Sequence, residues 1–122
     1  MNYQIFNDNL NVVELYDCEW DSFSIYVKSG VFSGRYNFYI ELSCLRSNII
    51  ELEELSQKLS GEGILEDMDS DSHLKFVMQK YGKLSFSGKL GSSLNNNYVV
   101  FEFIADQTLL QNMIEALKKI CG

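Results

Sequence analysis

Apolar and polar residues alternate over the first third of the chain, with the two-residue period of a strand that packs on one face. In the segment 22–28, Phe23, Ile25 and Val27 fall on one face and polar residues fall mainly on the other. In the segment 35–42, the residues that share a face are Tyr36, Phe38, Ile40 and Leu42. We therefore expect four strands in this part, and the pattern assigns ranges to three of them: 10–16, 22–28 and 35–42.

The period then lengthens to steps of three and four, which is typical of one stripe of a helix. The apolar positions of this stripe are Leu45, Ile49, Leu52, Leu55 and Leu59. Ser43 is the predicted N-cap of this helix, and Gly61 is the predicted C-cap glycine.

The second half repeats the plan of the first. Strand patterns cover 63–68, 73–81, 83–91 and 97–105. A second helix is predicted after Asp106, its N-cap. Its apolar stripe is Leu109 or Leu110, followed by Met113, Ile114, Leu117 and Ile120. Short turns join consecutive strands, so the sheets are expected to be antiparallel. The predicted class is α+β, with about eight strands and two helices in the order ββββ-α-ββββ-α, in a single domain over residues 1–122.

Charge and composition narrow the functional classes. The chain has 122 residues, 10 basic and 17 acidic, for a net charge of −7. Nucleic-acid binding requires a basic footprint, so direct nucleic-acid binding is not expected. The chain shows no signal peptide and no apolar run long enough for a membrane helix. Its three cysteines, Cys18, Cys44 and Cys121, form no CxxC motif, which favours reduced thiols in a cytoplasmic protein.

No catalytic, cofactor or metal motif stands out. His73 is the single histidine, and nothing near it marks a nucleophile, so it is read as a surface residue and the chain as a non-enzyme. Asp67, Asp69 and Asp71 fit the first positions of a calcium loop. The glycine and glutamate that such a loop needs are replaced by Ser72 and Met78, so no metal site is expected. The glycine-rich segments lack the strand–loop–helix context of a phosphate site, and no cofactor is predicted.

Two acidic segments are the candidate partner-binding sites. The segment 66–73 is either a solvated acidic turn between two strands or an acidic recognition patch, whose carboxylates repel one another and gain from a cationic partner. The segment 17–21 places Trp20 among acidic residues. Trp20 is expected to cap one end of the core, and the alternative is that it anchors a protein interface. The predicted contact residues are Asp17, Glu19, Asp21, Glu66, Asp67, Asp69 and Asp71.

Several segments together resemble a known family. They are WDSFSIYVKSGVFSG (20–34), IIELEELSQKLSG (49–61), KLG (89–91) and FEFIADQTLL (101–110). In order and spacing the chain resembles the WapI-like family of small bacterial immunity proteins. The resemblance implies a protein that binds the toxic C-terminal domain of a contact-delivered, cell-wall-associated toxin, often a nuclease. It implies no catalytic residues, and it implies fold-maintaining roles for Trp20, Phe23, Phe32, Gly34, Phe101, Phe103 and Asp106.

The leading hypothesis is therefore a monomeric immunity protein that neutralises a toxin domain by stoichiometric binding. An acidic protein can cover the basic cleft of a nuclease and associate with it rapidly. The alternative is a domain without catalytic activity that binds a small apolar ligand, in a cavity lined by Phe23, Phe38, Tyr39 and Phe101, or that serves another kind of interaction.

Overall fold

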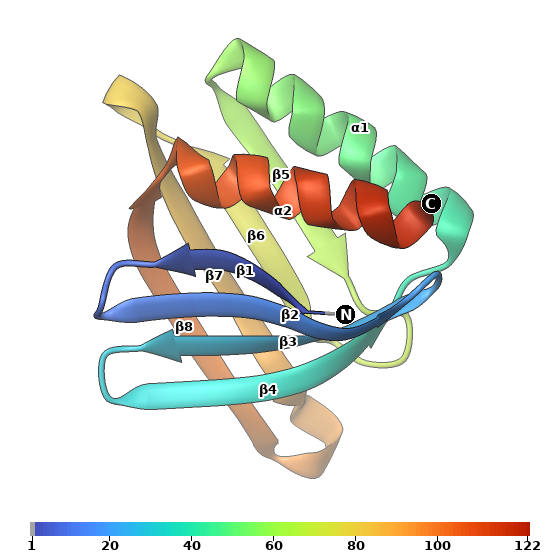
Figure 1. Cartoon of the computed structure of the whole chain (residues 1–122). Coiled ribbons are helices and arrows are strands. Elements are labelled where there is room, and N and C mark those ends of the chain that lie inside the picture. The colour runs from blue at the N-terminus through green and yellow to red at the C-terminus, as the bar shows by residue number, and fades with distance from the viewer. Residues whose placement is uncertain (1) are drawn as a thin grey trace.

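The computed structural model describes residues 2–122 and shows two antiparallel sheets and two helices (Figure 1). The first sheet, sheet A, has the order β1-β2-β3-β4, and the second, sheet B, has the order β5-β6-β7-β8. The strands are β1 (Tyr3–Asn7), β2 (Asn11–Glu19), β3 (Ser22–Ser29), β4 (Phe32–Tyr39), β5 (Gly61–Glu66), β6 (His73–Met78), β7 (Lys83–Ser92) and β8 (Asn97–Asp106). The helices are α1 (Leu42–Lys58) and α2 (Gln107–Cys121). The predicted class, strand number and element order are confirmed.

The two sheets cross each other, with sheet A in front of sheet B in Figure 1. They contact each other where β4 and β3 meet β7 and β8. Toward β1 and β5 the sheets diverge, and α2 fills the space between them, with α1 beside it against β5. Neither helix lies in front of β2, β3 or β4, so the outer face of sheet A is uncovered in this view.

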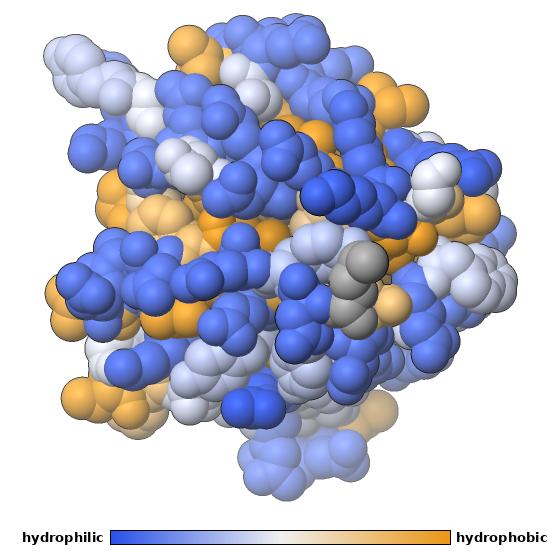
Figure 2. Space-filling view, in the orientation of Figure 1, coloured by the Kyte–Doolittle hydropathy of each residue, from blue (hydrophilic) through white to orange (hydrophobic). Residues whose placement is uncertain are grey.

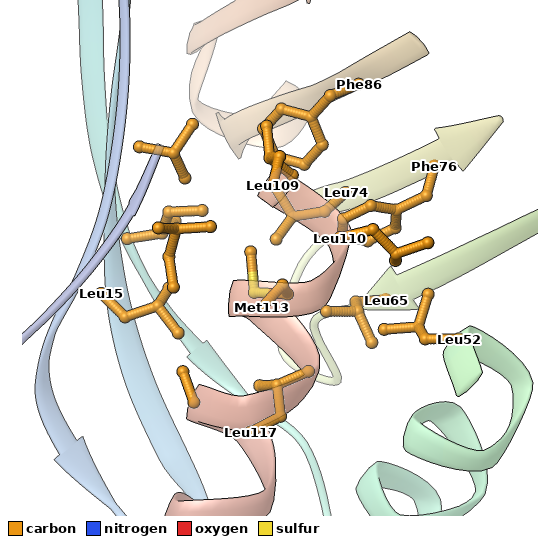
Figure 3. Close-up of a cluster of buried hydrophobic side chains, with 14 of the residues drawn as sticks. Leu15, Leu52, Leu65, Leu74, Phe76, Phe86, Leu109, Leu110, Met113 and Leu117 are labelled. Carbon is orange, nitrogen blue, oxygen red and sulfur yellow. The ribbon is translucent and has the colours of Figure 1, made fainter. Parts of the chain in front are cut away.

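The core explains why α2 is apolar on two sides. Leu109, Leu110, Met113 and Leu117 of α2 are fully buried. Figure 3 shows them between Leu15 of sheet A on one side and the side chains of sheet B and α1 on the other. The labelled partners there are Leu65, Leu74, Phe76 and Phe86 of sheet B and Leu52 of α1. Both sheets and both helices therefore share one hydrophobic cluster.

The ends of the helices confirm one predicted cap and correct two. Asp106 caps α2, because its side chain accepts a hydrogen bond from the Thr108 N–H at 2.9 Å. The N-cap of α1 is Glu41 and not Ser43, and its carbonyl accepts the first helical bond, from the Leu45 N–H at 2.9 Å. The C-cap is Leu59 in the left-handed region (φ 56°), so Gly61 does not end the helix and instead begins β5.

The strand boundaries also differ from the sequence pattern. The strand without a predicted range is β1, and β4 ends at Tyr39, before Ile40 and Leu42. The strand β6 ends at Met78, because a short turn follows in which Tyr81 has a φ of 63°. Leu59 is half exposed at the C-cap, so the buried stripe of α1 ends at Leu55, one position short of the prediction.

Two of the positions that the resemblance assigns to maintaining the fold lie outside the core. Trp20 and Phe32 are 63% and 71% exposed. Phe23, Phe101 and Phe103 are buried, and they pack on other aromatic rings. A Cβ at Gly34 would lie 3.0 Å from Val99 Cγ1, so this glycine allows β4 to approach β8 closely.

The loop between β5 and β6 is fastened to the end of sheet A by a buried carboxylate. Asp67 is 6% exposed, and its Oδ1 accepts a hydrogen bond from the Tyr39 N–H at 2.9 Å. Its Oδ2 accepts one from Ser70 Oγ at 2.6 Å. The Met68 N–H donates in return to the Tyr39 carbonyl at 3.0 Å. These bonds join the end of β4 to the start of the loop, across the gap between the two sheets.

The first prediction concerns α2. Leu117→Ala removes a fully buried side chain from the centre of the core and leaves a cavity. We expect it to lower the free energy of unfolding by roughly 2–5 kcal/mol, measured by urea denaturation. Glu115→Ala on the exposed side of the same helix is the control and should change it by less than about 0.5 kcal/mol. Equal effects of the two substitutions would contradict the placement of α2 between the sheets.

The second prediction concerns Asp67. Asp67→Ala leaves the Tyr39 N–H without its acceptor and should lower the free energy of unfolding by about 1–3 kcal/mol. Asp67→Asn retains an acceptor oxygen and should cost less than about 1 kcal/mol. The exposed Asp69→Ala is the control and should be nearly neutral. If Asp67→Ala is as stable as Asp69→Ala, the carboxylate does not hold the loop.

Candidate functional site

The structure brings the two predicted acidic segments together at one end of the molecule. The turn between β2 and β3 carries Trp20 and Asp21, and the Asp21 carbonyl accepts a hydrogen bond from the Ile40 N–H at 3.1 Å. The β5–β6 loop binds the neighbouring residue Tyr39 through Asp67 and Met68. The end of β4 thus lies between the two acidic segments, on the right-hand side of Figure 1.

We name this surface the acidic end. Its residues come from the β2–β3 turn, the end of β4 and the β5–β6 loop, and none of the three segments forms a helix or the interior of a strand. The acidic end comprises Glu19, Trp20, Asp21, Tyr39, Glu41, Glu66, Met68 and Asp69.

Trp20 is exposed at the centre of the β2–β3 turn, and the expectation that it caps the core is wrong. Glu19 and Ser22 are the last pair of the hairpin, so Trp20 and Asp21 form a two-residue turn beyond the sheet. The Trp20 side chain is 63% exposed, while Tyr39 and Met68 are 37% and 43% exposed. Tryptophan and tyrosine are enriched among the residues that dominate protein interfaces, so their exposure here favours a binding surface.

A bulge in β2 precedes the turn. The pairing of β2 with β3 shifts register between Tyr16 and Glu19, and within this interval Asp17 has a φ of 49°. Aspartate tolerates the left-handed region better than most residues, but the conformation still carries strain. Bulges redirect strand ends and are frequent beside functional sites. Asp17 is exposed and adds a carboxylate just behind the turn.

Negative charge at the acidic end is not compensated within the described chain. Ion pairs among residues 2–122 join Lys75 to Glu62, Lys89 to Asp71 and Lys118 to Glu53, all outside this surface. The carboxylates that have no ion-pair partner among these residues include Glu19, Asp21, Glu41, Glu66 and Asp69. Like charges that share a surface repel one another, so a cationic partner would relieve this repulsion.

Two of the predicted contact residues have internal partners. Asp67 is buried and bonded as described above. Asp71 forms an ion pair with Lys89 at 2.6 Å and accepts hydrogen bonds from the Ser93 hydroxyl and N–H. The hydrogen bond from Lys89, and then those from Ser93, hold the pKa of the Asp71 carboxyl well below its ordinary value. Asp71 therefore fastens the β5–β6 loop to the β7–β8 turn.

Sequence reasoning missed Tyr39, Glu41 and Met68 as members of this surface. A signal for Tyr39 existed, because the alternation around Phe38 puts Tyr39 on the opposite, outward face. Met68 and Glu41 give no such signal. Their proximity depends on a contact between the Glu41 N–H and the Met68 sulfur at 3.3 Å, which joins segments 27 residues apart.

The residues proposed for a small-ligand cavity do not surround one. Phe23 and Phe38 have no accessible surface, and their rings stack 5.5 Å apart. Phe101 packs on Phe86, while Tyr39 belongs to the acidic end. A void large enough for a ligand would leave these side chains accessible surface. Phe23 and Phe38 are therefore part of a packed core and do not line a cavity.

The other chemical groups of the described chain are dispersed. His73 is half buried at the start of β6, with Nδ1 at 3.2 Å from the Asp71 carbonyl. Among residues 2–122, no three His, Cys, Asp or Glu side chains converge in a way that would hold a metal ion. Burial raises the pKa of the Cys18 and Cys121 thiols, which lowers the fraction present as reactive thiolate. In the same part of the chain, neither helix has the length and apolar character to span a membrane.

Among the comparisons with known proteins, only the comparison with protein families gives a match. No curated protein and no solved structure matches the chain. The family described as the "Immunity protein WapI-like family" matches residues 1–122. That match includes every strand and helix of the fold and the whole acidic end. This chain therefore belongs to the WapI-like immunity protein family.

Proposed function

We propose that this chain is an immunity protein that neutralises a bacterial toxin domain by binding it one-to-one through the acidic end. The observation that carries the proposal is the exposed Trp20, which lies on a turn among carboxylates without ion-pair partners. An aromatic anchor inside a charged rim is a common arrangement at tight protein interfaces. Membership of an immunity family supports a protein partner for this surface.

The proposed partner is the C-terminal domain of a contact-delivered toxin, and its proposed activity is that of a nuclease. A nuclease must hold phosphates, so its cleft is rich in lysine and arginine. Carboxylates at the acidic end would occupy positions that the phosphates of the substrate otherwise take. The net charge of −7 would also steer the two proteins together and raise the association rate.

The proposal requires no chemistry from the chain itself. Inhibition by coverage needs a stable surface, and the acidic end is held by the Asp67 and Met68 contacts to β4. We propose that the protein acts in the cytoplasm of the producing cell, is monomeric when free and carries no cofactor. Its direct contacts would be Asp17, Glu19, Asp21, Glu66 and Asp69, with Asp67 and Asp71 shaping the loop.

The third prediction tests this function in cells. The C-terminal domain encoded by the open reading frame immediately upstream, as the candidate toxin domain, is expressed with and without this protein, and growth is scored. We expect growth to be arrested by the toxin domain alone and restored by the wild-type protein, with a one-to-one complex on co-purification. Toxicity without rescue and without a complex would overturn the proposal.

Binding kinetics measured with the purified toxin domain distinguish the acidic end from the rest of the surface. Trp20→Ala should weaken binding of the toxin domain by roughly 30-fold or more if Trp20 is the anchor. The double substitution Glu19→Lys, Asp69→Lys should slow association by about tenfold or more and make it less sensitive to salt. Glu51→Lys, Glu54→Lys on the exposed face of α1 changes the net charge equally and is the matched control. Equal losses in the two double variants would assign the effect to net charge and not to the acidic end.

A further inference from the structure

The outer face of sheet A carries a second group of interface-type residues. Side chains of β2, β3 and β4 alternate between the core and the outside, and the outward set is polar and aromatic. Figure 2 shows this face, below the helices, as mainly blue and pale, with orange patches toward its left-hand end. The outward residues are Glu14, Tyr16, Ser24, Tyr26, Lys28, Ser33, Arg35, Asn37 and Tyr39.

Arg35 lies across two tyrosine rings at the centre of this face. It pairs with Tyr26 across β3 and β4, and its Cζ is 4.9 Å from the centroid of the Tyr26 ring. The same atom is 5.7 Å from the centroid of the Tyr16 ring on β2. Cation–π contacts with two rings favour a position of the guanidinium over the sheet. This preference lowers the cost of ordering the side chain when a partner binds.

The guanidinium has no anionic partner in the described chain. Although the protein carries 17 acidic residues, none of those among residues 2–122 forms an ion pair or hydrogen bond with Arg35. A guanidinium has five N–H donors in a planar fork that matches a carboxylate, and stacking on rings leaves the edge of that fork free. Arg35 is exposed, so this edge is accessible to a second protein.

The face is continuous with the acidic end. Tyr39 follows Arg35 and Asn37 on the outward side of β4 and is itself part of the acidic end. Asn37 Nδ2 donates to Ser24 Oγ at 2.9 Å, which ties β4 to β3 between the two regions. One partner surface can therefore cover both. Trp, Tyr and Arg are the residue types most enriched among interface hot spots, and this strip contains all three.

We infer that the toxin domain docks across the outer face of sheet A and places a carboxylate of its own against the Arg35 guanidinium. This rests on the proposed function, because the partner is the same protein that the acidic end binds. Charge complementarity defines the partner surface. It presents basic groups to the acidic end and an Asp or Glu side chain to Arg35. The opposite charges at the two places fix its orientation, since a rotated partner would oppose like charges.

The test uses the wild-type protein and an arginine-specific dicarbonyl reagent. The chain has only two arginines, Arg35 on sheet A and Arg46 on α1, and both are exposed. Modification of each is followed by mass spectrometry in the free protein and in the complex with the upstream-encoded toxin domain. We expect the complex to protect Arg35 by about tenfold or more and to leave Arg46 unchanged. A complex that forms with no protection of Arg35 would overturn the inference and leave the proposed function standing.

Variants give a second readout. Arg35→Ala should raise the Kd for the toxin domain roughly 30-fold or more, mostly through faster dissociation. Arg35→Lys keeps the charge but loses the planar fork, and should raise it about tenfold. Arg46→Ala has the same change in net charge and is the control. Thermal unfolding checks that each variant folds, and unchanged Kd values for both Arg35 variants would overturn the inference.

These experiments distinguish failure of the proposed function from failure of the inference about Arg35. If the wild-type protein neither rescues growth nor forms a complex, the proposed function fails and the inference fails with it. If Arg35 in the free protein is protected from the reagent at high protein concentration and becomes reactive on dilution, the face is covered by a second copy of this chain. That result would also overturn the inference.

Discussion

The whole fold depends on burying α2 between two diverging sheets. One helix supplies the apolar contacts for Leu15 of sheet A and for Leu74 and Phe86 of sheet B, so neither sheet has a complete core without it. This explains why α2 is buried on two sides while α1, which contacts α2 and β5, has a narrower stripe. It also leaves the outer faces of the sheets free of any helical cover, and sheet A is therefore available for binding.

Side-chain hydrogen bonds hold the loops that the hydrophobic core does not reach. The hydrophobic cluster sets the relative position of the sheets, but it does not reach the loops that leave their ends. Asp67 connects the β5–β6 loop to β4, and Asp71 connects the same loop to Lys89 and Ser93 beside β8. A surface built from three chain segments thus keeps one shape. A defined shape reduces the conformational entropy lost when a partner binds.

The periodicity of the sequence was sufficient to predict the strands, the helices and their order, because an element that buries one face has apolar residues at a regular spacing. It placed Phe23, Ile25 and Val27 in the core, together with the stripe of α2. It failed where a single backbone conformation decides the outcome. The two-residue turn puts Trp20 outside the sheet, and the left-handed Leu59 ends α1 before Gly61. It also could not find Asp67's role, since the donor lies 28 residues away on Tyr39.

The acidic end lies on turns and loops, and most of its side chains contact solvent and not the hydrophobic cluster. Substitutions at Glu19, Trp20 or Asp69 therefore leave the stability of the fold nearly intact. Within a lineage, such a surface is free to follow a changing partner one residue at a time, while the scaffold stays the same. Asp67 beneath this surface is different, because any residue that replaces it must still accept the hydrogen bond from the Tyr39 N–H. The exposed positions of these loops can therefore change with little cost to the fold, whereas Asp67 and Asp71 are constrained by the bonds that hold the β5–β6 loop.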